Sequence, residues 1–100
     1  MVTFEKLDPV IHSRIRLSIL SVLISVKEAD FAYLKDATGT TDGNLSTHLS
    51  KLEESGYIEI KKSFKGKKPH TSCVITDIGR SAFSNYVETL KEFIHIDIKE

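Results

Sequence analysis

Cysteine is almost absent from this sequence, which has Cys73 alone in 100 residues. A single cysteine excludes an internal disulfide and a metal centre built from several thiolates. Cys73 lies in a segment rich in β-branched residues, where a lone cysteine usually serves as a small buried hydrophobe. We interpret it as a core residue, with a redox switch as the alternative.

A long uninterrupted apolar run is also missing. The most apolar stretch, residues 10–26, contains Arg14, Arg16 and several serines, so it is too polar to span a membrane. No basic start or small-residue cleavage site surrounds it, as a secretory signal would require. We expect a cytoplasmic protein with one domain over residues 1–100 and a core between about residues 7 and 94, because this length suits a single hydrophobic core.

Catalytic motifs are lacking as well. The sequence contains no G-x-S-x-G turn and no glycine-rich phosphate loop. His48 and Ser50 do not make a catalytic pair, since residues two apart on a helix point in different directions. His95 with Asp97 supplies at most half of a metal-ligand set, and His12 is expected on the exposed side of a helix. We therefore expect no enzymatic activity, no cofactor and no metal site.

Net charge is zero, with 14 basic and 14 acidic residues, which by itself weighs against a polyanionic partner. The distribution is uneven, however, because five lysines fall within eight residues that contain no acid. Such a segment can bind phosphates locally even on a neutral protein. The alternative is a solvated loop that the charge keeps soluble. The five are Lys61, Lys62, Lys65, Lys67 and Lys68.

Apolar residues recur at steps of three and four between Ile11 and Ile24, which predicts a first helix that ends near Val26. Asp8 is a suitable N-cap for it. Pro9 suits the first helical position, where a missing N–H costs nothing. The first helix is therefore expected to begin at this Asp-Pro pair.

Two shorter helices are predicted next. Asp30 is a plausible N-cap for one of them, and Gly39 ends it in the left-handed conformation. The other covers residues 42–55, with Thr41 as its cap and Gly56 as its stop. The turn between them is only a few residues long, as a helix-turn-helix requires.

The apolar period then changes from helical to alternating. Residues 57–61 and 71–75 are predicted strands, and the glycine and proline within residues 65–69 place a hairpin tip between them. A final helix is expected over about residues 76–96, capped by Thr76 or Asp77. The fold class is thus α+β and mainly α, with a three-helix core, a two-stranded basic hairpin and a long C-terminal helix.

The helix at residues 42–55 has an unusual exposed face. Leu45, Leu49 and Leu52 form a narrow apolar stripe, and the other positions carry small polar side chains that favour helices poorly. A slim polar helix fits the major groove of DNA, whose bases offer donors and acceptors to such side chains. A plain solvated helix is the alternative. The polar positions are Asp42, Gly43, Asn44, Ser46, Thr47, His48, Ser50 and Lys51.

The run N-L-S-T-H-L-S-K-L-E-E-S-G-Y from Asn44, the lysine-rich turn after it, and T-D-I-G-R from Thr76 together resemble the winged-helix domain of MarR- and ArsR-type regulators. The resemblance covers about residues 7–94 and is most specific over residues 43–83. It implies that residues 42–55 are a recognition helix and residues 61–70 a wing. The residues it places on DNA are Thr41, Asn44, Ser46, Thr47, His48, Lys51, Lys62, Lys65, Lys67, Lys68 and His70.

The same resemblance implies a homodimer joined through terminal helices. The last helix carries more apolar surface than one helix edge needs to bury, and some of it would meet a partner copy. Two departures from the family stand out. Relatives often carry a larger aromatic residue in place of Cys73, and the wing has lysines where arginine is common, which favours phosphate contact over minor-groove insertion. The expected interface residues are Phe83, Tyr86, Val87, Leu90, Phe93 and Ile94.

Two functions remain open from sequence. One is a dimeric repressor that binds an inverted repeat, with each recognition helix in a major groove. Repression is favoured over activation because 100 residues leave no segment for contact with polymerase. The other is a winged-helix module for protein contacts, which the zero net charge favours. A small-molecule effector would bind at the dimer interface or between the recognition and terminal helices, although no polar cluster in the sequence indicates a pocket.

Overall fold

Four helices and a three-stranded antiparallel sheet make up the part of the chain that the structure describes. The computed structural model describes residues 6–98, and the side chains of residues 6–94. In chain order the elements are α1 (Arg14–Ser25), β1 (Ala29–Asp30), α2 (Phe31–Thr38), α3 (Asp42–Glu54), β2 (Ile58–Lys65), β3 (Lys68–Ile75) and α4 (Asp77–Ile98).

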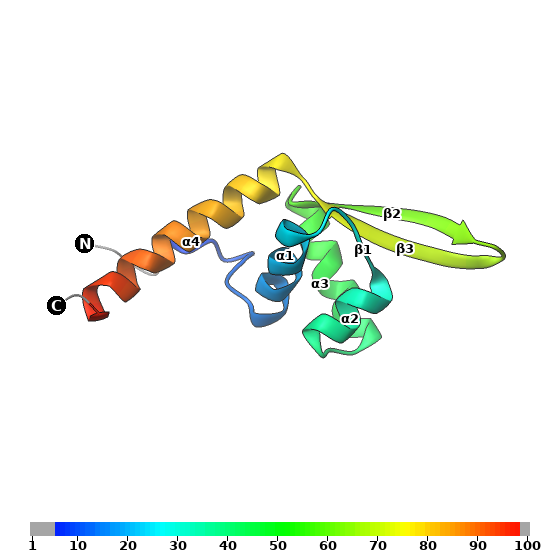
Figure 1. Ribbon diagram of the computed structural model, residues 1–100, viewed down its shortest axis with the longest axis horizontal. Coiled ribbons are helices and arrows are strands. Elements are labelled where there is room, and N and C mark those ends of the chain that lie inside the picture. Colours follow the sequence, from blue (N-terminus) through cyan, green and yellow to red (C-terminus); the bar gives the residue numbers. More distant parts are fainter. Residues whose placement is uncertain (1–5, 99–100) are drawn as a thin grey trace.

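The three short helices form a central body from which two long elements project in opposite directions (Figure 1). The β2–β3 hairpin extends from one end of this body, and the C-terminal half of α4 extends from the other. The principal extents are therefore unequal, at 58 × 25 × 21 Å. Within the described residues no helix is both long enough and apolar enough to cross a bilayer.

The core lies where α1, α2 and α3 meet the base of the sheet. α1 contributes Ile19, Leu20 and Leu23, all fully buried, because its apolar residues recur at helical spacing. α3 contributes only the leucine stripe predicted from sequence, with Leu45, Leu49 and Leu52 at 0–2% exposure. The rest of the α3 surface is consequently left for other contacts.

Helices α2 and α3 begin and end as the sequence predicts. The Asp30 side chain accepts a hydrogen bond from the Tyr33 amide at 2.8 Å, and Thr41 accepts one from the Asn44 amide at 3.2 Å. Gly39 closes α2 with φ +67°, a conformation that glycine adopts without steric cost. The short connection at residues 39–41 gives the expected helix-turn-helix.

The predicted start of the first helix at Asp8 and Pro9 is wrong. α1 begins at Arg14, and its N-cap is Ser13, whose hydroxyl accepts from the Arg16 amide. Asp8 instead caps a separate turn: its carboxylate accepts from the Val10 amide and its carbonyl from the His12 amide, both at 2.8 Å. His12, expected on the first helix, therefore lies in the turn that precedes it.

Ile11 explains why the periodicity was misleading. It is fully buried in the core, yet it reaches the core from this turn and not from a helix. Helical spacing of apolar residues indicates which side chains are buried. It does not show that the backbone is helical, because a turn that precedes a helix can also direct an apolar side chain into the core. Leu7, on the same segment, is also buried.

The sheet is larger than the two-stranded hairpin expected. β1, at Ala29 and Asp30, adds a third strand, and the strand order is β1-β3-β2. β2 and β3 also pair to the end of the hairpin, so that only Gly66 and Lys67 form the turn between them. A two-residue strand has no alternation to detect, which is why the sequence did not reveal it.

Cys73 lies in β3, the central strand, between Ala29 and Ile60. Its side chain is fully buried. Burial raises the pKa of the Cys73 thiol to about 11, with smaller contributions from the charges of Glu53 and Glu28. A neutral, inaccessible thiol is a packing residue, as the composition suggested.

A compact junction joins α3, the hairpin and α4. Thr76 caps α4 by accepting a hydrogen bond from the Gly79 amide at 3.0 Å, and the same hydroxyl donates to the Gly56 carbonyl at 2.6 Å. The Thr76 amide donates to the carbonyl of Tyr57 at 3.0 Å. Gly79 permits this approach, because a Cβ there would lie 2.1 Å from the Tyr57 carbonyl oxygen.

Replacing Gly79 with alanine is expected to destabilise the protein by about 2–3 kcal/mol, since the new methyl group collides with backbone that cannot move without breaking the junction. Urea unfolding monitored by circular dichroism measures this change. Gly43→Ala is the matched control, because a Cβ at Gly43 in α3 meets nothing within 4 Å. It should instead stabilise the helix by about 0.5–1 kcal/mol. Equal stability of the two variants would contradict the packing role given to Gly79.

Candidate nucleic-acid interface

The exposed face of α3 is slim and polar over its first nine residues, 42–50. Asn44, Ser46, Thr47 and Ser50 are all exposed, and none of them has a side chain longer than asparagine. Lys51 is exposed further along the helix. The face therefore presents hydrogen-bonding groups close to the helix backbone, which is the geometry a helix needs in order to enter a groove about 12 Å wide.

Gly43 shows that this face is not optimised for the stability of the helix. It lies in the first turn of α3 with ordinary helical geometry, and a Cβ there would meet nothing within 4 Å. A helical glycine costs about 0.5–1 kcal/mol relative to alanine. No packing contact within the described structure requires a glycine at this position.

An ion pair neutralises the carboxylate at the start of α3. Lys35 of α2 lies 2.8 Å from Asp42, and both side chains are exposed. The hydrogen bond and charge of Asp42 raise the pKa of Lys35. Asp42 is favourable for the helix end, but alone it would repel a phosphate, and the lysine offsets that repulsion.

His48 is half-buried and is held by a residue that the sequence did not single out. Arg16 of α1 places Nη1 2.9 Å from His48 Nδ1, while its Nε donates to the Val10 carbonyl at 2.5 Å. Since the guanidinium can only donate, Nδ1 accepts and the proton of a neutral His48 lies on Nε2. The one available signal was an arginine inside the otherwise apolar stretch of residues 10–26.

The charge state of His48 follows from the same contact. Partial burial lowers its pKa, and the positive charges of Arg16 and Lys51 lower it further. A neutral ring at neutral pH offers a defined Nε2–H donor. Such a donor suits an acceptor on a base edge, the role expected of His48 from its place in the sequence.

The two faces of the basic hairpin carry different side chains. Alternation along β2 places Lys62 and Phe64 on the face that carries the buried Ile58 and the half-buried Ile60. A groove of about 180 Å³ separates this face from α3, and its lining includes Lys62 and Ser46. Lys65, Lys68 and His70 occupy the opposite face, and Lys67 lies in the turn.

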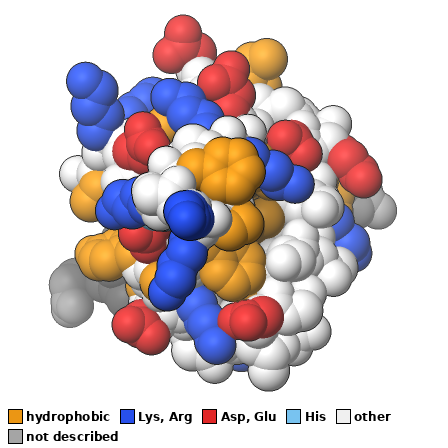
Figure 2. Space-filling view, turned by 90° about the vertical axis from the view of Figure 1, so that its right-hand side faces the viewer, with side chains coloured by type: hydrophobic (Ala, Val, Ile, Leu, Met, Phe, Trp, Pro, Cys, Tyr) orange, Lys and Arg blue, Asp and Glu red, His pale blue; other side chains and the backbone are white. Residues whose placement is uncertain are grey.

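The hairpin tip concentrates positive charge that the protein does not neutralise. Lys65 and Lys68 are directly opposite each other across the strands, an arrangement that is unfavourable in the absence of an anion. Among the described residues, Lys62, Lys65, Lys67 and Lys68 have no ion-pair partner. In the end-on view of the hairpin, several Lys and Arg side chains lie beside a central group of hydrophobic ones (Figure 2).

Lys61 differs from the other hairpin lysines. It lies 3.8 Å from the Glu28 carboxylate, to which Ser72 also donates a hydrogen bond. Glu28 thus ties the strand β1 side of the sheet to the base of the hairpin. Lys61 thus has an ion-pair partner within the protein, whereas the four lysines nearer the tip have none among the described residues.

The sequence matches the winged helix DNA-binding domain family over residues 15–94. The chain belongs to this family. The match includes α3 and the whole basic hairpin, so the resemblance inferred from the sequence motifs is confirmed. The hairpin is the wing of the fold, and α3 is the second helix of its helix-turn-helix.

Related proteins support this assignment. An uncharacterized protein of Methanocaldococcus jannaschii is 44% identical over 78 residues, which are 78% of this chain and 85% of the relative. A solved transcriptional regulator homologue from Pyrococcus horikoshii OT3 is 28% identical, with a TM-score of 0.78 over 85% of this chain and 84% of its own. Bacillus subtilis PadR, solved in complex with operator DNA, shares the fold at 15% identity and a TM-score of 0.62, covering 82% of this chain and 60% of its own.

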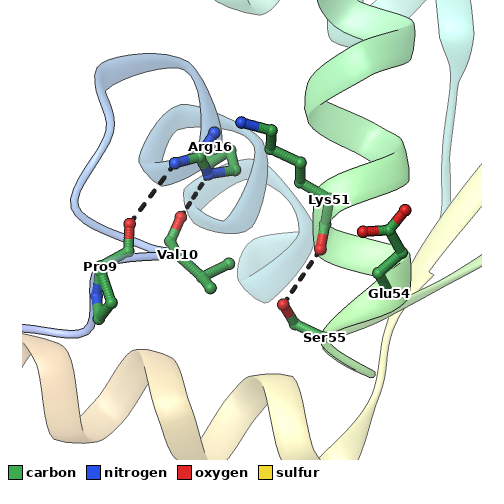
Figure 3. Close-up of a pocket in the computed structure, with 6 residues that line it drawn as sticks. All are labelled: Pro9, Val10, Arg16, Lys51, Glu54 and Ser55. Atoms are coloured by element: carbon green, nitrogen blue, oxygen red, sulfur yellow. Dashed lines mark hydrogen bonds between the residues drawn. The ribbon is translucent and has the colours of Figure 1, made fainter.

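A pocket of about 330 Å³ lies beside the C-terminal end of α3. Arg16 and Lys51 extend toward each other across it, and Pro9, Val10, Glu54 and Ser55 complete its lining (Figure 3). The small-molecule effector expected from sequence stays a prediction. Among the described residues no group of three His, Cys, Asp or Glu side chains could hold a metal ion. His95 and Asp97 lie outside the described side chains.

The apolar side chains of α4 divide into two groups. Tyr86 is buried within its own chain and its hydroxyl lies 2.8 Å from His12 Nδ1, so it is a core residue of the protomer. Ile94 is 46% exposed. Tyr86 is therefore not available for contact with a partner copy, and the other five expected interface residues remain. We call the surface they form the terminal-helix surface, and it comprises Phe83, Val87, Leu90, Phe93 and Ile94.

Gly43→Ala is expected to separate stability from DNA binding. The added methyl group should raise the free energy of unfolding by about 0.5–1 kcal/mol, because alanine favours the helix. If α3 is the recognition helix expected from the sequence, the same methyl group adds bulk to its exposed first turn, so affinity for duplex DNA should fall. Fluorescence anisotropy and urea unfolding of one preparation measure both effects. A variant that is more stable and binds DNA with undiminished affinity would contradict this explanation of Gly43.

Proposed function

We propose that this protein is a transcriptional regulator that binds duplex DNA sequence-specifically as a homodimer. α3 enters the major groove, and the basic hairpin contacts phosphates or the minor groove beside it. The observation that carries the proposal is the set of four unpaired lysines on a hairpin next to a slim polar helix. Phosphate contacts of this kind supply most of the affinity of DNA-binding proteins.

Sequence discrimination is assigned to α3. Asn44 can bind an adenine edge through two hydrogen bonds, and His48 can donate from Nε2 to a base acceptor. Ser46, Thr47 and Lys51 lie on the same exposed face or next to it. Thr41, the N-cap residue of α3, is also exposed. A bidentate base contact contributes about 1–3 kcal/mol of discrimination.

A dimer suits this arrangement because two copies of α3 related by a two-fold axis would read the two halves of an inverted repeat. The terminal-helix surface supplies apolar area for such a contact, because Ile94 is 46% exposed and its other members are only partly buried. PadR, of the same fold, has been solved on operator DNA. Repression follows most simply, since a bound dimer blocks promoter DNA without further surfaces.

Replacing Lys65, Lys67 and Lys68 with alanine should weaken binding to all duplexes. The slope of log affinity against log salt should become shallower by about 0.9 for each phosphate that the variant no longer neutralises. Anisotropy titrations of a random duplex at several salt concentrations measure this slope. Wild-type binding is expected between about 1 and 100 µM at physiological salt.

The matched control removes the same charge elsewhere, with Lys6, Lys27 and Lys91 replaced by alanine. All three are exposed and lie outside the hairpin. If both triple variants lose affinity equally, net charge and not the hairpin is responsible. If wild type does not bind DNA even at low salt, the zero net charge favours the second function, a winged-helix module for protein contacts.

Replacing Ile94 with aspartate should dissociate the homodimer, with a dissociation constant raised about tenfold or more, because a charge would be buried in an apolar contact. Sedimentation velocity measures the distribution of monomer and dimer. Ile78→Asp is the matched control: it lies in the same helix and is more exposed, at 63% against 46%, but is outside the terminal-helix surface. Dimers that persist in the Ile94 variant would place the interface elsewhere.

A further inference from the structure

Phe64 is the most exposed large hydrophobic side chain in the described part of the chain, at 72%. It lies in β2, one residue before Lys65 at the end of the strand, and pairs across the hairpin with Pro69. The hairpin tip thus carries an apolar pair that no other described part of the protomer covers. From sequence, Pro69 served only to indicate the turn, and Phe64 was assigned no role.

The surroundings of this pair are strongly cationic. Lys62 shares its face of the hairpin, Lys65 and Lys68 form the next cross-strand pair, and Lys67 lies in the turn. No acidic residue occurs between Glu59 and Asp77. In Figure 2 several Lys and Arg side chains lie next to the hydrophobic group at this end of the molecule, although Asp and Glu side chains are visible around it as well.

A second protein is a poor occupant for such a tip. A stable protein interface buries about 800 Å² on each partner, which a single phenylalanine and proline cannot approach. Four uncompensated lysines would also have to be desolvated there. A polyanion with an apolar interior satisfies both features, because it neutralises the lysines and accepts the aromatic ring.

We propose that Phe64 inserts as an apolar wedge into the DNA minor groove at a flexible pyrimidine–purine step, while the surrounding lysines hold the flanking phosphates. The inference rests on the proposed DNA binding and deepens it. The minor groove is about 6 Å wide, so it admits side chains from a hairpin tip. Apolar wedges between base steps partially unstack them and kink the duplex.

The wedge makes a prediction opposite to that of the lysines. Lysines alone favour an A-tract, whose narrow minor groove has enhanced negative potential. A wedge favours TA steps, which are flexible and unstack easily, whereas A-tracts are stiff. Two duplexes of the same base composition, one alternating TA and one an A-tract, therefore distinguish the two modes.

The experiment measures the affinities of wild type and Phe64→Ala for both duplexes by anisotropy at fixed salt. Wild type should prefer the alternating duplex, and Phe64→Ala should bind it about tenfold more weakly, the effect expected when one aromatic–base stacking contact is removed. The salt slope should not change, because the substitution leaves every charge in place. Ile78→Ala, which removes an exposed isoleucine from α4, is the control and should behave as wild type.

A spectroscopic readout tests the contact directly. The chain contains no tryptophan, so Phe64→Trp introduces a single fluorophore at the hairpin tip. Its emission should be quenched when the alternating duplex is added, owing to stacking on bases. Ile78→Trp places the same fluorophore on α4 and should show no quenching.

The outcomes are separable from those of the proposed function. Salt-dependent binding with no preference for TA steps, no effect of Phe64→Ala and no quenching would overturn the wedge and leave DNA binding intact. Preference for the A-tract by wild type would also overturn it. Absence of any salt-dependent binding would overturn the proposed function, and the wedge with it.

Discussion

The hydrogen bonds of Thr76 to the backbone of Gly56 and Tyr57 are the constraint on which the arrangement of this molecule depends. They join the residues that follow α3 to the first residues of α4, and the whole hairpin lies between these two points. Because Gly79 lets α4 begin against the Tyr57 carbonyl, the direction of the hairpin is fixed relative to α3. The exposed face of α3 and the hairpin are thereby held in a fixed relative position.

Much of this could be predicted because the signals were local. The leucine stripe of α3, its Thr41 cap and the lysine-rich turn each occupy adjacent residues, and all lie where expected. The failures concern tertiary contacts. The Asp8 carboxylate accepts a hydrogen bond from the Val10 amide in a turn that ends before α1 begins. The two residues of β1 form a strand only because they pair with β3. Neither outcome is encoded in a periodic pattern.

The candidate site was incomplete for the same reason. Arg16 belongs to α1, and it becomes relevant only where folding sets it against His48. Phe64 lies beyond the strand predicted at residues 57–61, and only its exposure of 72% singles it out. Conversely, Tyr86 had the spacing of an interface residue and proved to be core, because the turn around His12 packs against it. Composition and spacing identify which side chains are apolar, but not which of them the fold leaves uncovered.

The net charge of zero does not describe the local electrostatic potential at the proposed interface. Two of the acids near the proposed interface are paired: Asp42 with Lys35, and Glu28 with Lys61. Glu53 and Glu54, at the C-terminal end of α3, are exposed. The lysines at the hairpin tip have no such partner among the described residues. Charge separation within a neutral chain therefore gives a local cationic surface without general attraction to polyanions. Under the proposed DNA binding, the rest of the surface would limit non-specific attraction. A larger share of the discrimination would then come from uncharged groups, namely the small polar face of α3 and the aromatic ring at the hairpin tip.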